Sequence, residues 1–337
     1  MIKEGIEKLL AGSSLEEVEI REIFDEINSG LANDVDVSSF VTAFSMSKDL
    51  NEDSLCSMIT SSRDSIKKIN FGINNEEIIE NTFFDFDDNF LNIPFCVDLV
   101  CASANLPTAR YCFNDLFSYN NSFLIAKKFE IPYLYSSEDN SDFFEKNCFG
   151  YVLLSEQNPY LKYTRDISTK MKFDNVFKII DKMLNPYCAK NQLIGLKKID
   201  FVEKFARLCL LLKNTNSIVI SGESVPFVNL SGKTLVAEAW KNKIFTYNLS
   251  ADLFGLKNSP LDVLKVENLE HNVEIIQNLV NGKIKNGIYD YVVANSGLAL
   301  YISKKADSFM SGIDLAKRLI DNGIVMEKLA LLSYKNQ

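Results

Sequence analysis

Over the first seventy residues, apolar side chains recur at spacings of three and four, which predicts a bundle of short amphipathic helices. One helix is expected within 15–29, a second from near Asp36, and a third after Asn51. Ser14 lies three residues before Glu17, so we expect it to cap the first of these helices in a capping box, and Gly30 to end that helix.

From about residue 90 the pattern changes to short apolar runs of strand length that alternate with helical stretches. The runs at 151–154 and 217–220 are predicted strands, and the stretches 201–213 and 311–323 are predicted helices. The run at 289–295 fits either a strand or another buried segment. Pro186 marks a turn before a further predicted strand, QLIGL. This alternation predicts an α/β domain with a largely covered sheet.

Composition limits the possible functions. The net charge of −9 argues against a protein that binds nucleic-acid phosphates. The seven cysteines are scattered singly and fit small buried side chains in a reducing compartment. The N-terminus has no apolar core of a signal peptide, and no uncharged apolar stretch reaches about 18 residues. We therefore expect a cytoplasmic protein with neither nucleic acid nor membrane as a partner.

Separate segments, in the same order, resemble the anthranilate phosphoribosyltransferase family. The opening SLEEVEIREIFDEINSGLAN resembles its first helices, MLNPYCAKNQLIGL its Leu-Asn-Pro turn and following strand, and KTLVAEAWKNKIFTYNLSADLFGL the segment after its acidic metal motif. The C-terminal part is similar over LEHNVEIIQNLVNGKIKNGIYDYVVANSGLALYISKKADSFMSGIDLAKRLIDNG. The chain thus resembles a divergent member of that family.

The resemblance implies a two-domain architecture like that of nucleoside phosphorylases and phosphoribosyltransferases, α/β with an N-terminal helical bundle. Residues 1–70 would form the helical domain, with helices from about 158–182 as candidate additions to it. Residues 71–337 would form the α/β domain, with the active cleft between the two. The helical domain would also form a homodimer.

The family's phosphate loop is glycine-rich, because glycine lets backbone N–H groups approach a pyrophosphate. The matching stretch here, TFFDFDDNFLNIPFC (82–96), keeps Asn92 and Ile93 but has Pro94 where the family has serine. No glycine occurs between Gly72 and Gly150, so no shift of register restores the loop. We therefore expect this stretch to be unable to hold a diphosphate.

The family's other site motifs are also altered. Arg110 is the cation left in the segment that matches Lys-His-Gly-Asn, and Pro159 and Lys162 are the substrate-side positions retained. The arginine that would hold the anthranilate carboxylate falls near Asp174, a reversal of charge. The paired acids for Mg²⁺ fall within 224–231, which contains no carboxylate.

Other candidate sites have ordinary structural explanations. Asp85, Asp87 and Asp88 are candidate metal ligands, or an exposed acidic turn. His271, the sole histidine, has no nucleophile that the sequence identifies beside it, and the stretches 221–224 and 231–234 lack the other residues of a phosphate-binding loop. The phenylalanines near the phosphate loop either belong to the core or close the cleft; they are Phe83, Phe84, Phe86 and Phe90.

Two functions remain as hypotheses. The first is a non-catalytic homologue, a pseudoenzyme that acts in binding or assembly, has no cofactor, and has an unidentified small-molecule ligand. The alternative is an active glycosyltransferase: a phosphoribosyltransferase that joins anthranilate to phosphoribosyl pyrophosphate in tryptophan biosynthesis, or a related enzyme with a rebuilt site. The alternative would require Mg²⁺.

Overall fold

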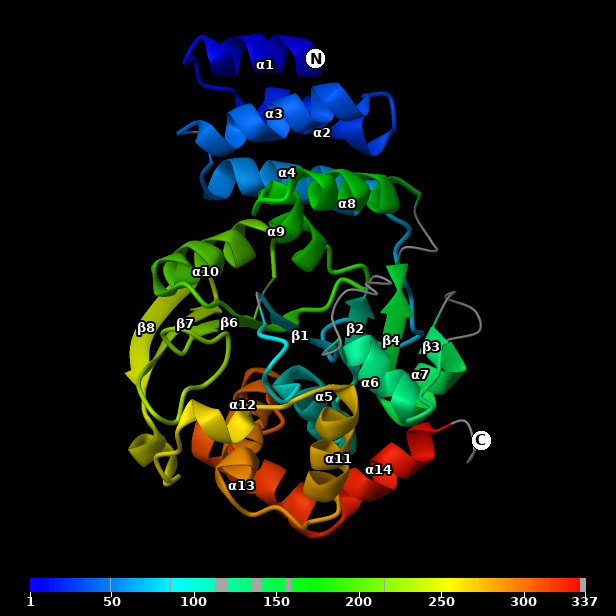
Figure 1. Ribbon diagram of the computed structural model, residues 1–337, viewed down its shortest axis with the longest axis vertical. Helices are drawn as coiled ribbons and strands as arrows, with labels where there is room; N and C mark the ends of the chain where they lie inside the picture. Colours follow the sequence, from blue (N-terminus) through cyan, green and yellow to red (C-terminus); the bar gives the residue numbers. More distant parts are fainter. Residues whose placement is uncertain are drawn as a thin grey trace.

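The computed structural model describes residues 1–48, 50–84, 86–112, 121–134, 141–154, 159–214 and 216–333. Within these ranges a helical bundle is stacked on an α/β domain, and Figure 1 shows the bundle above the sheet and most remaining helices below it. This confirms the predicted fold class. No helix in the described ranges is both long and apolar enough to cross a membrane.

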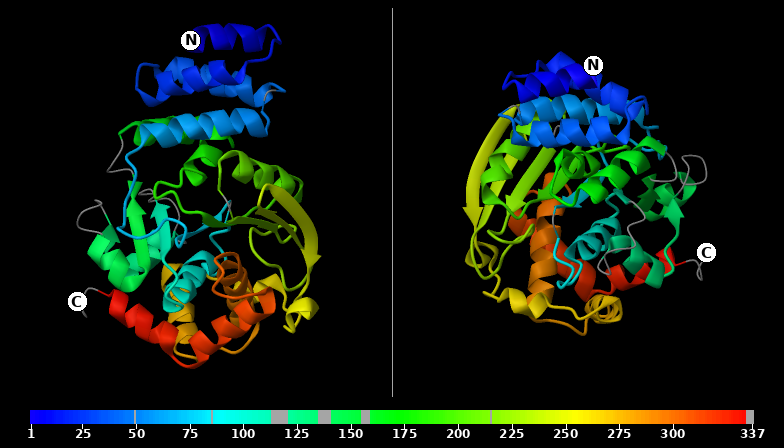
Figure 2. Two further views of the ribbon diagram at one scale, coloured as in Figure 1. Left: turned by 180° about the vertical axis from the view of Figure 1, so that it is seen from behind. Right: turned by 45° about the horizontal axis from the view of Figure 1, so that its top comes forward.

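The bundle is built from two separate stretches of the chain. Its N-terminal helices are α1 (Ile2–Leu10), α2 (Glu17–Asn28), α3 (Asp34–Met46) and α4 (Glu52–Ser65), and its later helices are α8 (Pro159–Met171) and α9 (Val176–Lys182). The left view in Figure 2 shows α4 between the outer helices and the α/β domain. The rings of Phe24 and Phe177 lie 6.1 Å apart, and the Tyr163 hydroxyl donates to the Ala32 carbonyl at 2.9 Å. These contacts join the two stretches.

The helix predicted to follow Asn51 is confirmed as α4. Asn51 caps it, with its side chain accepting from the backbone N–H groups of Asp53 and Ser54. The assignment of Ser14 is wrong, because the N-cap of α2 is Glu16, whose backbone N–H donates to the Glu19 carboxylate at 3.0 Å. A glutamate can therefore replace the expected serine at this position.

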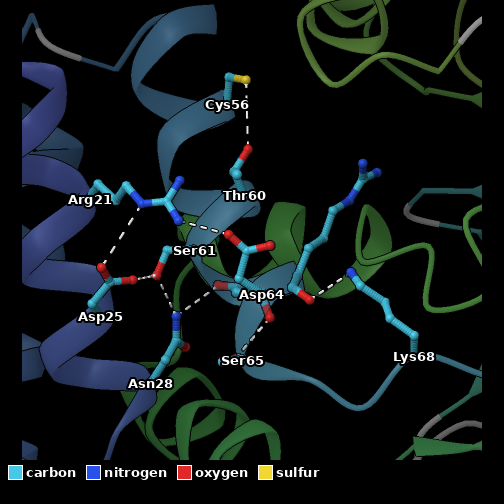
Figure 3. Close-up of polar contacts among 11 residues, drawn as sticks. Arg21, Asp25, Asn28, Cys56, Thr60, Ser61, Asp64, Ser65 and Lys68 are labelled. Carbon is cyan, nitrogen blue, oxygen red and sulfur yellow. Dashed lines mark hydrogen bonds and ion pairs between the residues drawn. The ribbon is translucent and has the colours of Figure 1, made fainter.

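Polar contacts fix the register of α2 against α4 (Figure 3). The Asn28 amide donates to the Ser61 hydroxyl at 3.0 Å, and this hydroxyl donates to the Asp25 carboxylate at 2.5 Å. Arg21 and Asp64 form a 2.7 Å ion pair at the surface, which contributes little because water screens it. The buried Asn28 therefore provides the more specific restraint.

The described ranges form an eight-stranded sheet in the order β3-β4-β2-β1-β5-β6-β7-β8. The strands are β1 (Ile79–Phe83), β2 (Thr108–Cys112), β3 (Tyr133–Leu134), β4 (Phe149–Leu153), β5 (Asn191–Gly195), β6 (Asn216–Ser221), β7 (Thr234–Trp240) and β8 (Lys243–Leu249). The strands β1 to β6 run parallel, and β7 and β8 add an antiparallel hairpin at one edge. The predicted strands at 151–154 and 217–220 and the strand after Pro186 are confirmed.

Apolar clusters cover both faces of the sheet, because successive strand side chains point to opposite sides. Ile79 and Phe83 belong to one cluster, and Ile78 and Phe84 to the other. The helices of the domain are α5 (Ile93–Ser103), α6 (Ser122–Lys128), α7 (Ser141–Asn147), α10 (Val202–Leu211), α11 (Leu269–Val280), α12 (Gly287–Ile302), α13 (Phe309–Asp321) and α14 (Ile324–Leu332). The helices predicted at 201–213 and 311–323 are confirmed as α10 and α13. The run 289–295 is a buried part of α12, so the strand alternative for it is wrong.

Helices α12 and α13 touch through their backbones at Gly297 and Gly312. A Cβ atom added to Gly312 would lie 2.4 Å from the Gly297 carbonyl oxygen. Since that oxygen belongs to the main chain of a buried helix, it cannot move aside as a flexible side chain would.

We therefore expect Gly312→Ala to destabilise the protein by about 1–3 kcal/mol, because the helices must separate. In an ordinary helix interior, changing glycine to alanine stabilises the protein by up to about 1 kcal/mol. Destabilisation would therefore indicate that the two helix backbones are in contact. Urea unfolding measures the effect. Asp314→Ala, at an exposed position of the same helix, serves as the control and should lie within about 0.5 kcal/mol of wild type. A stabilised Gly312→Ala variant would show that the helices are not in backbone contact.

Candidate active-site cleft

A cavity of about 320 Å³ opens beside β1 and β2, on the side that faces α8 and α9. Its lining side chains come from the sheet, the start of α5, the start of α6, and the bundle. They are Glu80, Asn81, Thr82, Phe83, Phe86, Asp88, Asn92, Pro94, Arg110, Tyr111, Cys112, Asn121, Ser122, Arg165, Asp181 and Lys182. The cavity therefore lies where ligands enter α/β sheets, at the ends of parallel strands.

The cleft forms because β1 and β2 separate after a single pair. Ile79 pairs with Thr108, whereas all five residues of β1 pair with β5 and all five of β2 pair with β4. Residues of β1 after Ile79 and of β2 after Thr108 consequently line the cavity.

The Asp98 carboxylate, fully buried on α5, joins the two separating strands. One oxygen, Oδ2, accepts from Arg110 Nε at 2.6 Å and from the Tyr151 hydroxyl at 2.9 Å. The other, Oδ1, accepts from Asn81 Nδ2 at 2.9 Å. Burial by itself lowers the pKa of Arg110, but attraction to Asp98 outweighs burial and the pKa ends above its ordinary value. Arg110 is therefore a fixed cation whose charge is balanced.

A second buried carboxyl, Glu80, lies on the opposite face of β1. Its Oε2 accepts from Gln192 Nε2 at 3.0 Å, and Gln192 in turn accepts from Asn214. Burial raises the pKa of Glu80 to about 7, although the Gln192 hydrogen bond and the charges of Arg63 and Arg110 oppose the rise. Glu80 is therefore only partly ionised near neutral pH.

The bundle supplies the opposite wall of the cleft. Arg165 of α8 donates to the Asp181 carboxylate of α9 at 3.2 Å, and Lys182 ends α9. Among the described lining residues, Arg110, Arg165 and Lys182 are cations, and Glu80, Asp88 and Asp181 supply carboxyl groups. Cations from the sheet and from the bundle therefore face one cavity, which favours a ligand that carries negative charge.

Asn92 and Ile93, predicted as cleft positions, have different roles. The Asn92 side chain lines the cleft and caps α5, accepting from the Phe95 N–H at 2.8 Å and from the Ser122 hydroxyl at 3.0 Å. Ile93 is completely buried in the core. Pro94 lines the cleft beside them, where its ring nitrogen cannot donate a hydrogen bond.

Of the predicted substrate-side residues, Lys162 is not among the described residues that line the cleft, and the side chain of Pro159 lies outside the described part of the chain. Pro159 and Lys162 lie in the first turn of α8, and Lys162 is exposed. Asp174, where the family's arginine was expected, lies before α9 and pairs with Lys178 at 2.6 Å at the surface.

The candidate metal ligands do not form a cluster in the described residues, which contain no group of three or more His, Cys, Asp or Glu side chains that could hold an ion. Asp85 lies outside the described ranges. Asp87 accepts from the backbone and the side chain of Asn89, and Asp88 lines the cleft. Within the segment 224–231, residues 225–230 are packed into the core, with the Val228 N–H donating to the Asn295 side-chain oxygen. These residues do not fit a magnesium site built by protein carboxylates, and we derive no step through the metal.

The predicted phenylalanine cluster does not plug the cleft. Phe84 packs edge-on against Phe205 of α10, with ring centroids 5.2 Å apart. Phe86 and Phe90 pack against Phe227. Phe83, which is buried, and Phe86 both line the cavity, which nevertheless remains open.

Sequence reasoning missed Glu80, Asp98, Arg165, Asp181 and Lys182. One signal was present for Asp98, because it is the sole charged residue in the otherwise apolar run of α5. A charge inside a buried helix needs a partner, and a partner on another element indicates a built site.

Comparison with known proteins identifies the scaffold. Residues 3–65 match the family described as "Glycosyl transferase family, helical bundle domain", and residues 87–326 match "Glycosyl transferase family, a/b domain". An anthranilate phosphoribosyltransferase of Methanobrevibacter smithii is 26% identical over the full length of both chains. That of Vesicomyosocius okutanii is 25% identical, over 97% of this chain and 96% of the relative.

Solved structures show the same fold. The crystal structure of anthranilate phosphoribosyltransferase from Thermus thermophilus has a TM-score of 0.85 at 21% identity, covering 97% of this chain and 99% of that one. The Saccharomyces cerevisiae enzyme in complex with PRPP and Mg also has a TM-score of 0.85, at 18% identity, covering 98% and 96% of the two chains.

The raised pKa of Glu80 predicts how stability depends on pH. Below pH 4.5 the carboxyl is protonated in both the folded and the unfolded chain. Between pH 4.5 and about 7 it ionises only when unfolded, so stability falls as pH rises, by on the order of 3 kcal/mol in total. Above about pH 7 there is no further change from this group.

We expect Glu80→Gln to remove this dependence. Urea unfolding at pH 5, 6, 7 and 8 measures the free energy of unfolding of both proteins. The value for wild type minus that for the variant should fall by about 2–3 kcal/mol from pH 5 to pH 8. Glu77→Gln, at an exposed position three residues earlier, is the control and should give a constant difference. A constant difference for Glu80→Gln as well would contradict the assignment.

Proposed function

The chain belongs to the glycosyl transferase family that joins a helical bundle domain to an α/β domain, and from this premise we propose that it is a phosphoribosyltransferase. The observation that carries the proposal is the cleft between β1 and β2, which has the size of a small-molecule site and is lined by Arg110, Arg165 and Lys182. The curated relatives named above are anthranilate phosphoribosyltransferases, and one similar structure is a complex with PRPP and Mg.

The proposed reaction joins a nitrogen of the acceptor to C1 of the phosphoribosyl group. The N–C1 bond forms as the bond from C1 to the pyrophosphate oxygen breaks, and pyrophosphate leaves with the electron pair. The nitrogen loses its proton to water. Because negative charge grows on the leaving group, fixed cations in a confined cleft stabilise the transition state. Lys182 and Arg165 would meet that charge from the bundle side, and Arg110 from the sheet.

A second candidate function is that of a non-catalytic homologue. The observation that favours it is the lack of glycine anywhere between Gly72 and Gly150, together with a segment 224–231 that contains no carboxylate. Without a glycine-rich loop, few backbone N–H groups can reach a diphosphate. The two candidates differ in whether the cleft holds the sugar diphosphate.

Calorimetry with phosphoribosyl pyrophosphate and Mg²⁺ tests the donor side, and pyrophosphate release with anthranilate tests turnover. We expect binding, and we expect Lys182→Ala to weaken it about tenfold, because a cation in the cleft is lost. Lys178→Ala is the control. Lys178 is also on α9 but pairs with Asp174 outside the cleft, so its removal should leave the dissociation constant unchanged. No heat at millimolar ligand would reject the proposal in favour of the second candidate.

We also propose that two copies of the chain associate through the bundle. Val35 and Met46 are exposed large apolar side chains on α3, and their separation of eleven residues, about three turns, places them on one face. Leu31, just before α3, is 80% exposed. Such apolar exposure is typical of a surface that another chain covers.

Light scattering after gel filtration tests this association. The wild-type chain, of 38.2 kDa, should elute at twice its mass, and the double variant Leu31→Glu with Val35→Glu should elute as a monomer. Leu253→Glu introduces the same charge at an exposed leucine of the α/β domain and should remain dimeric. A monomeric wild type would exclude the proposal.

A further inference from the structure

A second cavity, of about 560 Å³, lies at the end of the sheet where its parallel strands begin. Its wall is formed by the starts of β5 and β6, the turn between β7 and β8, and the segments that follow α10 and α12. The cleft lies toward the other ends of the strands, and no described residue lines both cavities. A small molecule bound in this second cavity would therefore be separate from one bound in the cleft.

Four lysines surround the second cavity, each from a different connection. Lys190 precedes β5, Lys213 follows α10, Lys241 lies in the turn between β7 and β8, and Lys304 follows α12. Within the described ranges none of them pairs with a carboxylate, and Glu76 is the one acidic residue of the lining. Since the whole chain carries a net charge of −9, this concentration of positive charge is a local exception.

The ends of two helices account for part of this charge. Lys213 and Lys304 each follow the C-terminus of a helix, which carries about half a negative charge and attracts cations. Together with Glu76, the two helix ends offset about two of the four positive charges. The cavity therefore keeps an excess of about two positive charges, which favours an anionic ligand.

Three of the lysines occupy backbone positions at which other residues are usual. Lys213, Lys241 and Lys304 have φ angles of 59°, 48° and 57°, in the left-handed region. Glycine or asparagine is the common residue there, both just after a helix and in a tight hairpin turn. A larger side chain costs on the order of 1 kcal/mol at such a position. The backbone therefore gives no reason for lysine at these three positions, and their shared charge needs another explanation.

An aromatic ring and buried amides complete the lining. Trp240, the sole tryptophan of the chain, is 40% exposed, and Lys241 Nζ lies 4.2 Å from the centre of its ring. Asn191 and Asn214 are buried, and Asn216 Nδ2 donates to Asn191 Oδ1 at 3.0 Å. The cavity thus combines a fixed polar wall with several ammonium groups, which bind phosphate oxygens as point charges.

We propose that this cavity is a binding site for a small molecule that carries a diphosphate group. Ammonium groups from four separate connections can contact oxygens of both phosphates at once, whereas a single phosphate engages only some of them. A diphosphate also supplies enough negative charge to balance the excess of the cavity. The site does not depend on the proposed function, because it shares no described lining residue with the cleft.

The fluorescence of Trp240 tests the site directly, because no other tryptophan contributes to the signal. The probes are inorganic pyrophosphate and orthophosphate. We expect pyrophosphate to change the emission, since an anion draws Lys241 away from the indole ring, and to bind at least about tenfold more tightly than orthophosphate. Equal affinity for the two anions would overturn the proposal, and so would an unchanged emission at millimolar pyrophosphate.

Variants locate the bound diphosphate. Lys213→Gln and Lys304→Gln keep the length of the side chain but remove its charge, and each should weaken pyrophosphate binding about tenfold. Lys233→Gln is the matched control, because Lys233 is exposed just before β7 and lies outside the lining, so the affinity should stay within twofold. Equal effects of these three variants would overturn the site.

A variant of the cleft separates the two cavities. Lys182→Ala removes a cation that lines the cleft and should leave the pyrophosphate titration of Trp240 within twofold of wild type. Loss of the fluorescence change in this variant would show that the signal comes from the cleft and would overturn the proposal.

Discussion

The cleft depends on one buried interaction, the set of hydrogen bonds that converge on Asp98. This carboxylate on α5 is bound by side chains from β1, β2 and β4, so it fixes one helix against strands on both sides of the opening. Desolvating a carboxylate is costly, and a buried pair rarely stabilises a fold more than apolar packing would. What the arrangement provides is position: it holds Arg110 and Asn81 at a place where the sheet lacks its own backbone pairing. The positions of Arg110 and Asn81 are consequently fixed by hydrogen bonds to a buried carboxylate.

Much of the scaffold could be predicted from the sequence, because its elements repeat local patterns. The spacing of apolar residues indicated the bundle helices and α13, and short apolar runs indicated β4 and β6. The run within α12 was ambiguous, since a helix that is apolar on all sides gives no period. The cap of α2 was misplaced because Glu16 takes a role that serine usually has. Residue preferences at helix ends therefore fail to place a cap when a less common residue such as Glu16 occupies it.

The site was harder to predict than the fold. Arg110 could be found through the family resemblance, and Asp98 carried one signal as the sole charged residue of α5. Their pairing and the neighbour Asn81 could not be found, because a contact between separate elements leaves no trace in spacing. Arg165 and Lys182 are ordinary basic residues of helical segments until the bundle folds against the sheet. The relatives are about 25% identical and share the scaffold. The polar groups at the inner end of the cleft are thus better understood from the contacts of this chain than from the family's motifs.

The division of the bundle between two stretches of sequence has a consequence for synthesis. Helices α1 to α4 leave the ribosome first, but the residues that complete their packing, such as Phe177, follow more than a hundred positions later. At usual elongation rates this delay is roughly ten seconds. During that time the early helices expose an apolar face, and the nascent chain is then a natural client for chaperones that shield such surfaces. A truncation that removes α8 and α9 would leave the apolar face of the early helices exposed permanently.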